Sequence, residues 1–420
     1  MDKDITETTF LQYLGPINFK KFDELLTNLN VDKYVKKLST PKMIMLLIYA
    51  QLFPVDSLTH LSTVLNSNDE LQECINLDSI STSQLSRKLR DLTPDLLETI
   101  FTQLVIKAIA KNGVKEVKNT LKHINIIDAS TVSMAISQYP WADFRKTKAG
   151  VKINLRIKFC SESDKVMPDK VVISPAKNAD RSKMEDLVVT SENALNIFDR
   201  GYVDYEKFDE YTDDNVLFLS KLKSNAKIEY INTETKYVDG KEIKDSTVRL
   251  GTKNINQMKN NLRLLEIPDD KDPDKIIRII TNDFKRSAKE ISDLYRNRWK
   301  IELFFKWIKQ HLKIKTLLGF SQNSVENQIM TALITYLLLV LFKERVETLK
   351  PLLDIQRIIQ ECKYKPIKEF IKKLKRPPSR TSKGRRKIDH ETIFELILWQ
   401  AEQENTDHFY DESTYDPVVL

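Results

Sequence analysis

Cysteine and histidine are scarce in this chain. Its 420 residues include three cysteines, Cys74, Cys160 and Cys362, and five histidines. The cysteines lie far apart with no CxxC spacing, so neither a disulfide scaffold nor a zinc site of Cys and His ligands is expected. This cysteine usage is typical of a reducing cytoplasm.

The sequence also lacks a run of apolar residues long enough to cross a membrane. The longest runs, residues 43–55 and 330–342, fall short of the roughly 20 residues that a spanning helix needs. The chain opens on an acidic, polar stretch, where a secretory signal would be basic and then apolar. We therefore expect a cytoplasmic protein without a membrane partner.

The motifs of several enzyme classes are absent as well. We find no GxxxxGK[ST] phosphate loop, no GxSxG nucleophile elbow and no HExxH zinc motif. Nothing in the sequence therefore favours a P-loop nucleotidase, a serine hydrolase or a zinc protease.

Charge is abundant but unevenly distributed. The net charge of +7 favours a polyanionic partner only weakly. Residues 363–387, however, contain twelve Lys or Arg and one acid, Glu369, whereas residues 402–416 contain six acids and no Lys or Arg. This pattern predicts a C-terminal segment, 351–420, with a helical basic arm and an acidic tail; a solvated helix face with a frayed terminus is the alternative.

The N-terminal part, residues 1–115, reads as helical because its apolar residues recur every three to four positions. Within it, Ser81 precedes a basic amphipathic helix whose apolar face is formed by leucines. Such a capped helix is compatible with a helix-turn-helix that reads DNA, and equally with an ordinary surface helix. The cations that would contact DNA are Arg87, Lys88 and Arg90.

From residue 116 the pattern changes to alternating and apolar strands. An α/β sheet is indicated, because strands and helical stretches follow one another along the chain. A β-rich insertion is expected over residues 226–283, followed by helical periodicity that belongs again to the core, residues 284–350. The predicted strands are 123–127, 153–159, 170–174, 194–198 and 216–220, and the predicted helices are 181–190, 287–312 and 325–347.

Two aspartates, Asp128 and Asp199, directly follow predicted strands. The carboxyl ends of strands in an open α/β sheet are where ligands bind, so each acid is a candidate ligand for a cation. The alternative is that each carboxylate only caps the turn that follows it.

The helix predicted after residue 287 adds a third acid. Tyr295, Arg298, Glu302 and Lys309 stand at i, i+3, i+7 and i+14, which places them on one stripe of a helix. A surface charge ladder would have the same spacing, because Arg298 and Glu302 are an i,i+4 pair. Three carboxylates brought together have a chemical use, since two Mg²⁺ ions about 3.5–4 Å apart share oxygen ligands in phosphoryl transfer.

These motifs resemble those of the IS4 family of bacterial insertion-sequence transposases, within the DDE, or RNase H-like, class. The spacing Tyr295-x2-Arg298-x3-Glu302-x6-Lys309 matches the YREK signature of that family position by position. The stretches around Asp128 and Asp199 resemble its two aspartate motifs, and the resemblance extends from about residue 120 to 345. One departure is Lys221, which stands where the family usually has an arginine.

The resemblance implies an RNase H-like core with a β-rich insertion behind an all-helical N-terminal DNA-binding domain. It also implies an enzyme that binds terminal inverted repeats, cleaves them with Mg²⁺ (or Mn²⁺) held by Asp128, Asp199 and Glu302, and joins the 3′-ends to target DNA. Tyr295, Arg298 and Lys309 would contact DNA phosphates, as would Lys221.

Work on paired ends requires at least two protomers, so a homodimer is expected on DNA. The resemblance further implies excision through hairpin ends and a place in the bacterial nucleoid. Two other functions remain open at this stage. An RNase H-like nuclease would cleave without strand transfer, and a regulator derived from a transposon would bind DNA without cleaving it.

Overall fold

The computed structural model describes residues 7–111, 123–146, 148–160, 165–191, 194–238, 240–268 and 275–376. The chain forms two compact units. A helical unit comprises Met1–Leu104, Trp307–Gly319 and Asn323–Leu420, and a sheet unit comprises Val105–Lys306 and Phe320–Gln322. The finer predicted division into five segments stays a prediction.

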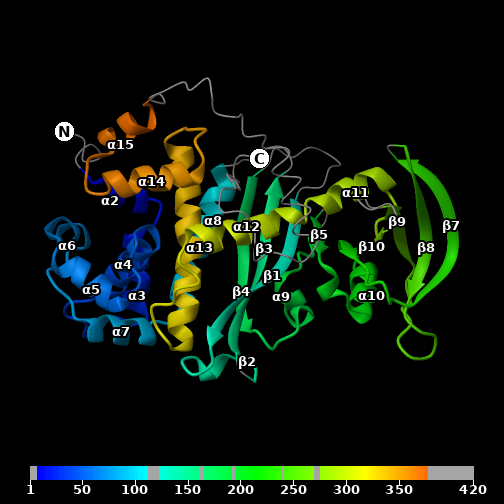
Figure 1. The fold of residues 1–420 in the computed structure, drawn as a ribbon, viewed down its shortest axis with the longest axis horizontal. Coiled ribbons are helices and arrows are strands. Elements are labelled where there is room, and N and C mark those ends of the chain that lie inside the picture. Colours follow the sequence, from blue (N-terminus) through cyan, green and yellow to red (C-terminus); the bar gives the residue numbers. More distant parts are fainter. Residues whose placement is uncertain are drawn as a thin grey trace. The chain divides into compact units, whose positions relative to one another are not determined.

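The N-terminal part is helical, as predicted (Figure 1). Five of its helices follow a residue whose side chain accepts a hydrogen bond from the first turn. At one of them, Ser81 and Gln84 form a full capping box. The helices of this part are α2 (Thr9–Leu14), α3 (Phe19–Asn28), α4 (Thr40–Leu52), α5 (Leu58–Asn66), α6 (Asp69–Ile75), α7 (Thr82–Asp91) and α8 (Pro94–Lys111).

Helix α13 (Gln322–Arg345) is the longest helix of the described residues, and from Asn323 on it belongs to the helical unit, which also contains α14 (Leu352–Cys362) and α15 (Ile367–Leu374). It is long and apolar enough to cross a membrane by composition, yet 94% of its most apolar window is buried within the protein. Tyr13 donates a hydrogen bond to the carbonyl of Thr335 at 2.8 Å, and Phe342 packs edge-on against both Tyr13 and Phe370. Its apolar length therefore serves the protein core.

The sheet unit contains one ten-stranded sheet. Its order is β2-β3-β1-β5-β6-β10-β9-β8-β7, with β4 paired to β3. The run β4-β3-β1-β5-β6, with β3 antiparallel and β5 and β6 parallel to their neighbours, is the RNase H-like arrangement that the resemblance implies. The strands are β1 (His123–Ala135), β2 (Asp143–Arg145), β3 (Lys148–Cys160), β4 (Lys165–Pro175), β5 (Ala194–Phe198), β6 (Leu217–Lys221), β7 (Ile228–Val238), β8 (Lys241–Leu250), β9 (Leu262–Pro268) and β10 (Ile276–Thr281).

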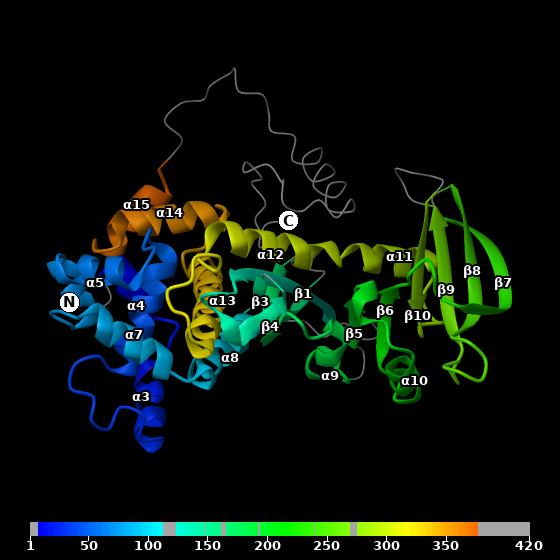
Figure 2. The same cartoon turned by 60° about the horizontal axis from the view of Figure 1, so that its bottom comes forward.

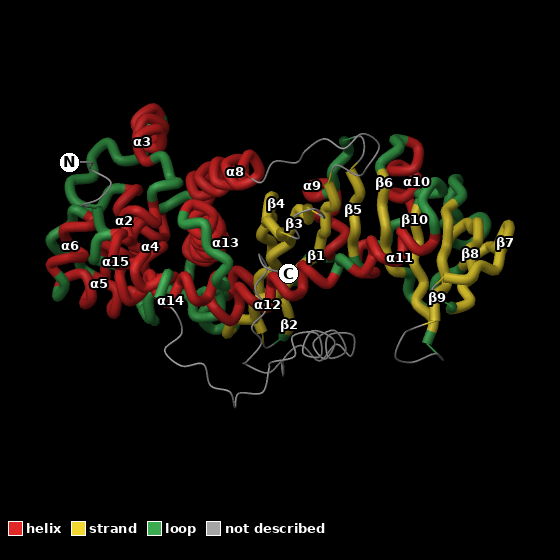
Figure 3. Tube along the Cα trace, turned by 90° about the horizontal axis from the view of Figure 1, so that it is seen from above, coloured by secondary structure: helices red, strands yellow, loops and turns green. Residues whose placement is uncertain are grey.

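The predicted β-rich insertion is an extension of this sheet. Strand β10 pairs antiparallel with β6, and β9, β8 and β7 continue outward from it (Figure 3). In Figure 2, α11 (Ala288–Arg296) and the first turns of α12 (Trp299–His311) lie along one side of the strands, and α9 (Met184–Leu187) and α10 (Tyr205–Asp213) lie on the other. Beneath α10, Phe208 stacks on Phe218 with ring centroids 4.4 Å apart.

Three sequence predictions were wrong in detail. The single helix predicted over 287–312 is two helices, because i→i+3 hydrogen bonds, such as that from Arg298 N–H to the Tyr295 carbonyl, replace i→i+4 bonds at the junction. The helix predicted over 181–190 is a 3₁₀ turn followed by four α-helical residues. Strand β1 does not end at Ile127 but continues to Ala135 against β3.

Candidate active site

Strand register brings Asp128 and Asp199 to neighbouring positions. The parallel ladder between β1 and β5 ends at the pair Ile127 and Phe198, and each aspartate is the next residue of its chain. The ladder between β5 and β6 ends at Phe198 and Ser220, so Lys221 follows in the same row. Two acids and a lysine therefore occupy equivalent positions on three adjacent strands.

The capping alternative is wrong for Asp199. Its backbone begins a short 3₁₀ turn, but its side chain accepts no capping hydrogen bond. Asp128 lies within β1, and its Oδ1 accepts a 2.7 Å hydrogen bond from the N–H of Ala129. The other carboxylate oxygen of Asp128, Oδ2, lies 3.9 Å from Nη1 of Arg298.

Arg298 lies between the acid on the helix and the acid on the strand. Its Nη1 is 2.5 Å from Oε1 of Glu302 and 3.9 Å from Oδ2 of Asp128. The residue is only 9% exposed, and its Nε is buried without a hydrogen-bond acceptor. The i,i+4 pair foreseen from the sequence is therefore a partly buried contact that also reaches Asp128 on the sheet.

Burial governs the titration of this cluster. Desolvation raises the pKa of Asp128 to about 7, against the favourable charge of Arg298, and the nearby carboxylates of Glu302 and Asp199 raise it further. Desolvation likewise raises the pKa of Glu302 and lowers that of Lys221. The charges of Asp199 and Arg298 thus act on both Asp128 and Glu302, which places these side chains within electrostatic reach of one another.

Tyr295 also belongs to this environment. Burial raises the pKa of its phenol, with Arg298 opposing the shift. The guanidinium carbon of Arg298 lies 6.0 Å from the ring centroid of Tyr295 and 5.2 Å from that of Trp299. The aromatic rings therefore flank the cation and exclude water from it.

The donor set suits a hard divalent cation, because all three acids offer carboxylate oxygens. Among the residues that the structure describes, however, no three His, Cys, Asp or Glu side chains converge closely enough to hold a metal ion. Arg298 explains this spacing, since its guanidinium occupies the space between Glu302 and Asp128. The role of Mg²⁺ ligands assigned to the three acids stays a prediction.

The other sequence candidates lie elsewhere. Lys309 stands in the last turns of α12 and belongs to the helical unit, so its contact with DNA stays a prediction. In α7, Lys88 forms a 2.6 Å ion pair with Asp32, and both side chains are largely buried. Its charge is thus neutralised within the protein, and its predicted contact with DNA stays a prediction.

The two other cations of α7 are exposed. Arg90 pairs with the neighbouring Asp91 at 3.0 Å, whereas Arg87 has no acidic partner in the described part of the chain. Of the basic arm, only residues up to 376 are described, with α15 at its start. The rest of the arm and the acidic tail lie outside the described residues.

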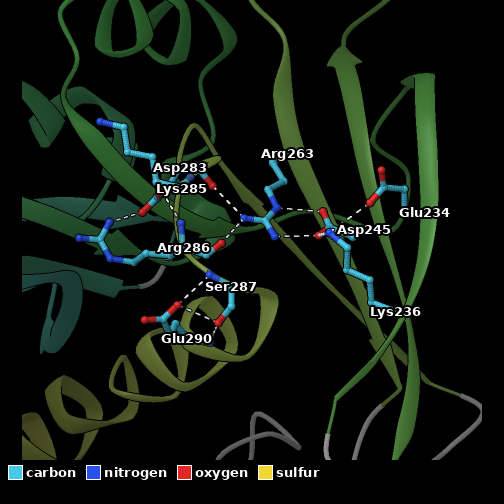
Figure 4. Close-up of polar contacts among 9 residues, drawn as sticks. All are labelled: Glu234, Lys236, Asp245, Arg263, Asp283, Lys285, Arg286, Ser287 and Glu290. Atoms are coloured by element: carbon cyan, nitrogen blue, oxygen red, sulfur yellow. Dashed lines mark hydrogen bonds and ion pairs between the residues drawn. The ribbon is translucent and has the colours of Figure 1, made fainter.

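A polar network that the sequence did not reveal joins the insertion to the start of α11 (Figure 4). Arg263 on β9 donates to both carboxylate oxygens of Asp245 on β8, at 2.8 and 2.7 Å. It also donates to the carbonyls of Asp283 and Arg286, at 3.2 and 2.6 Å. The loop that leads into the Tyr295 helix is thus tied to the extended sheet.

Comparisons with known proteins agree with this architecture. Residues 119–338 match the family model described as Transposase DDE domain, and residues 6–74 match one described as a domain of unknown function, DUF4372. The chain is 29% identical over 262 residues to the probable transposase for insertion sequence element IS5377 of Geobacillus stearothermophilus, covering 61% of this chain and 66% of that protein, slightly under two thirds. It is 27% identical over 290 residues to the putative transposase for insertion sequence element IS4SA of Synechocystis, covering 67% and 77%.

Proposed function

The chain belongs to the Transposase DDE domain family, and from this premise we propose that it cuts and rejoins DNA at the ends of its own insertion sequence. The observation that supports the proposal is the strand register, which sets Asp128 beside Asp199 with Glu302 within electrostatic reach of both. The substrate is duplex DNA that carries the terminal inverted repeats, with target DNA as the acceptor. Two copies of the chain act on two paired ends.

In this proposal, Asp128, Asp199 and Glu302 hold two Mg²⁺ ions, for which Mn²⁺ substitutes. Bound divalent ions supply activation of water or a 3′-hydroxyl and stabilisation of the leaving oxygen. The protein contributes a rigid frame, because Asp128 and Asp199 stand at the end of the parallel ladder between β1 and β5. Glu302 lies on α12, and Arg263 ties down the loop before α11, the helix that precedes it. The ends leave the flanking DNA as hairpins, and the enzyme works in the cytoplasm on the nucleoid.

Arg298 has two partners in succession. Without DNA it neutralises Glu302 and Asp128, so the acids are kept together without a metal. A scissile phosphate is a competing acceptor for a guanidinium, and its arrival draws Arg298 away from Glu302. The carboxylate of Glu302 is then available to a cation, so DNA and metal assist each other's binding. Lys221, beside Asp199, adds a second cation for the strand.

The decisive experiment compares Asp128→Asn, Asp199→Asn and Glu302→Gln with a control acid, Asp186→Asn. Asp186 lies on α9, is half-exposed and, among the residues that the structure describes, has one cationic partner, Lys183, at 3.6 Å. Nicking of a labelled duplex end in Mg²⁺ is expected to vanish in the three site variants and to persist in the control. Binding of the same duplex is expected to persist in all four, and nicking by any site variant at the wild-type rate contradicts the proposal.

The two other functions give different outcomes in the same assay. A nuclease without strand transfer nicks the end but joins no 3′-hydroxyl to a target plasmid. A DNA-binding regulator binds the end and ignores Mg²⁺. The strand register that sets Asp128 beside Asp199, with Glu302 within electrostatic reach, favours the transposase over the regulator, because DNA binding alone needs no cluster of acids.

A further inference from the structure

The segment between α3 and α4, residues 29–39, and helix α7 enclose a cleft of about 580 Å³ in the helical unit. This segment falls within the match to the domain of unknown function. Its apolar lining comes from both sides, with Val31, Val35 and Leu38 facing Leu92 and Leu96.

The basic side chains of the cleft have few acids to neutralise them. Lys36, Lys37 and Arg87 line it and are exposed, and none of them forms an ion pair in the described part of the chain. Lys37 donates only to the hydroxyl of Ser79, at 2.7 Å. The acid in the lining, Asp91, is already paired with Arg90.

The segment is also held firmly in place. Asp32 accepts hydrogen bonds from the N–H and the hydroxyl of Thr40, at 2.6 and 3.0 Å, and from Lys88 at 2.6 Å. Leu38 is buried, and Asn30 adopts a left-handed backbone conformation with φ of 54°. The one acid of the segment, Asp32, is therefore hydrogen-bonded within the protein, whereas the lysines of the segment are exposed.

Tyr34 stands at the rim of this cleft. Its side chain is 85% exposed, although a large aromatic residue gains free energy by burial. The ammonium of Lys33 lies 5.6 Å from its ring centroid. An exposed phenol among unneutralised lysines is suited to a partner that offers both phosphates and apolar sugar surface.

We propose that this cleft, the basic cleft, binds the backbone of duplex DNA at the ends of the element. Lys36, Lys37 and Arg87 contact phosphates, and Tyr34 packs on the deoxyribose between them. The inference rests on the proposed function for the identity of the DNA. It assigns the contact with DNA to residues 29–39 in addition to α7. Lys88 then has a structural role, because its ion pair with Asp32 holds that segment against α7.

The test uses the full-length chain and fluorescence anisotropy with a duplex end at several salt concentrations. Each phosphate contact contributes about 0.9 to the slope of log K against log salt. The double variant Lys36→Ala/Lys37→Ala is expected to lose about 1.8 from that slope, since two contacts disappear. The matched control, Lys20→Ala/Lys21→Ala on α3, removes the same charge outside the cleft and is expected to change the slope by less than about 0.5.

Variants of Tyr34 distinguish a packing contact with DNA from a charge contact with it. Tyr34→Ala is expected to weaken duplex binding roughly tenfold with an unchanged salt slope, and Tyr34→Phe to retain most of the affinity. An unchanged slope in the Lys36/Lys37 variant, or a loss confined to single-stranded DNA, overturns the basic cleft. If the wild-type chain neither binds nor nicks the duplex end, it is the proposed function that fails instead.

Discussion

The acid cluster of the sheet unit and the basic cleft of the helical unit use charge in opposite ways. At the acid cluster, the buried Arg298 lies 2.5 Å from the partly buried Glu302, so their charges are compensated within the protein. At the basic cleft, Lys36 and Arg87 are exposed and have no acidic partner in the part of the chain that is described. The acid cluster therefore depends on the fixed positions of its charged groups, whereas DNA binding at the basic cleft depends on the salt concentration.

The comparison is tested most strongly by removing Arg298. Arg298→Ala is expected to lower cleavage about 10²–10³-fold, because a preorganised cation at the reacting phosphate is lost. In the DNA-free protein, the same change is expected to tighten Mn²⁺ binding about tenfold at pH 8, because the competing guanidinium is gone. Calorimetric titration with Mn²⁺ measures this directly.

Arg298→Lys provides the control, because it keeps the charge and removes the planar fork. It is expected to bind Mn²⁺ with nearly wild-type affinity while cleaving poorly. Weaker Mn²⁺ binding by Arg298→Ala would show that Arg298 organises the carboxylates and does not compete with the metal.

The next largest effect concerns the network in the insertion. Arg263→Met leaves Asp245 buried without its bidentate partner, and breaking such a pair costs about 3–5 kcal/mol of unfolding free energy. The double variant Arg263→Met/Asp245→Leu is expected to recover part of this loss, since neither charge is then buried alone. Urea denaturation of both variants decides it, and an unchanged stability in Arg263→Met would contradict the network's role.

A smaller effect is expected from the pH dependence of Asp128. Its folded pKa, about 7, lies above the unfolded value of 3.8, so the folded state holds a proton that the unfolded state releases. The metal-free protein should therefore lose stability as the pH rises from about 4 to 7. Asp128→Asn should remove this slope and raise stability at pH 8 by about 1–3 kcal/mol. Denaturation at pH 5.5 and 8 provides the measurement, and an equal effect of the substitution at both pH values would contradict the assignment.

Parts of both sites could be predicted from the sequence. The signals for Asp128, Asp199 and Glu302 are local, namely an apolar strand pattern directly before each aspartate and a helical spacing around the glutamate. The register of the sheet then brings the two aspartates to neighbouring positions. The Arg263 network could not be foreseen, because its partners meet only through the pairing of β8 with β9 and the fold of the loop before α11. The ion pair of Lys88 could not be foreseen for a similar reason, since Asp32 lies 56 residues away in the chain.

The smallest effects separate Arg87 from Lys88, which are neighbours in sequence but differ in burial. Lys88→Ala is expected to lower the unfolding free energy by about 1 kcal/mol, because Asp32 loses a partly buried partner. Its effect on the salt slope of DNA binding should be small, since its charge is already neutralised inside. Arg87→Ala is expected to reduce that slope by about 0.9 and to leave stability unchanged. Parallel denaturation and anisotropy measurements on the two variants distinguish a cation that stabilises residues 29–39 from one that binds the DNA. The opposite pattern, with Lys88→Ala changing the slope and Arg87→Ala the stability, would mean that the segment rearranges on binding and releases Lys88 from Asp32.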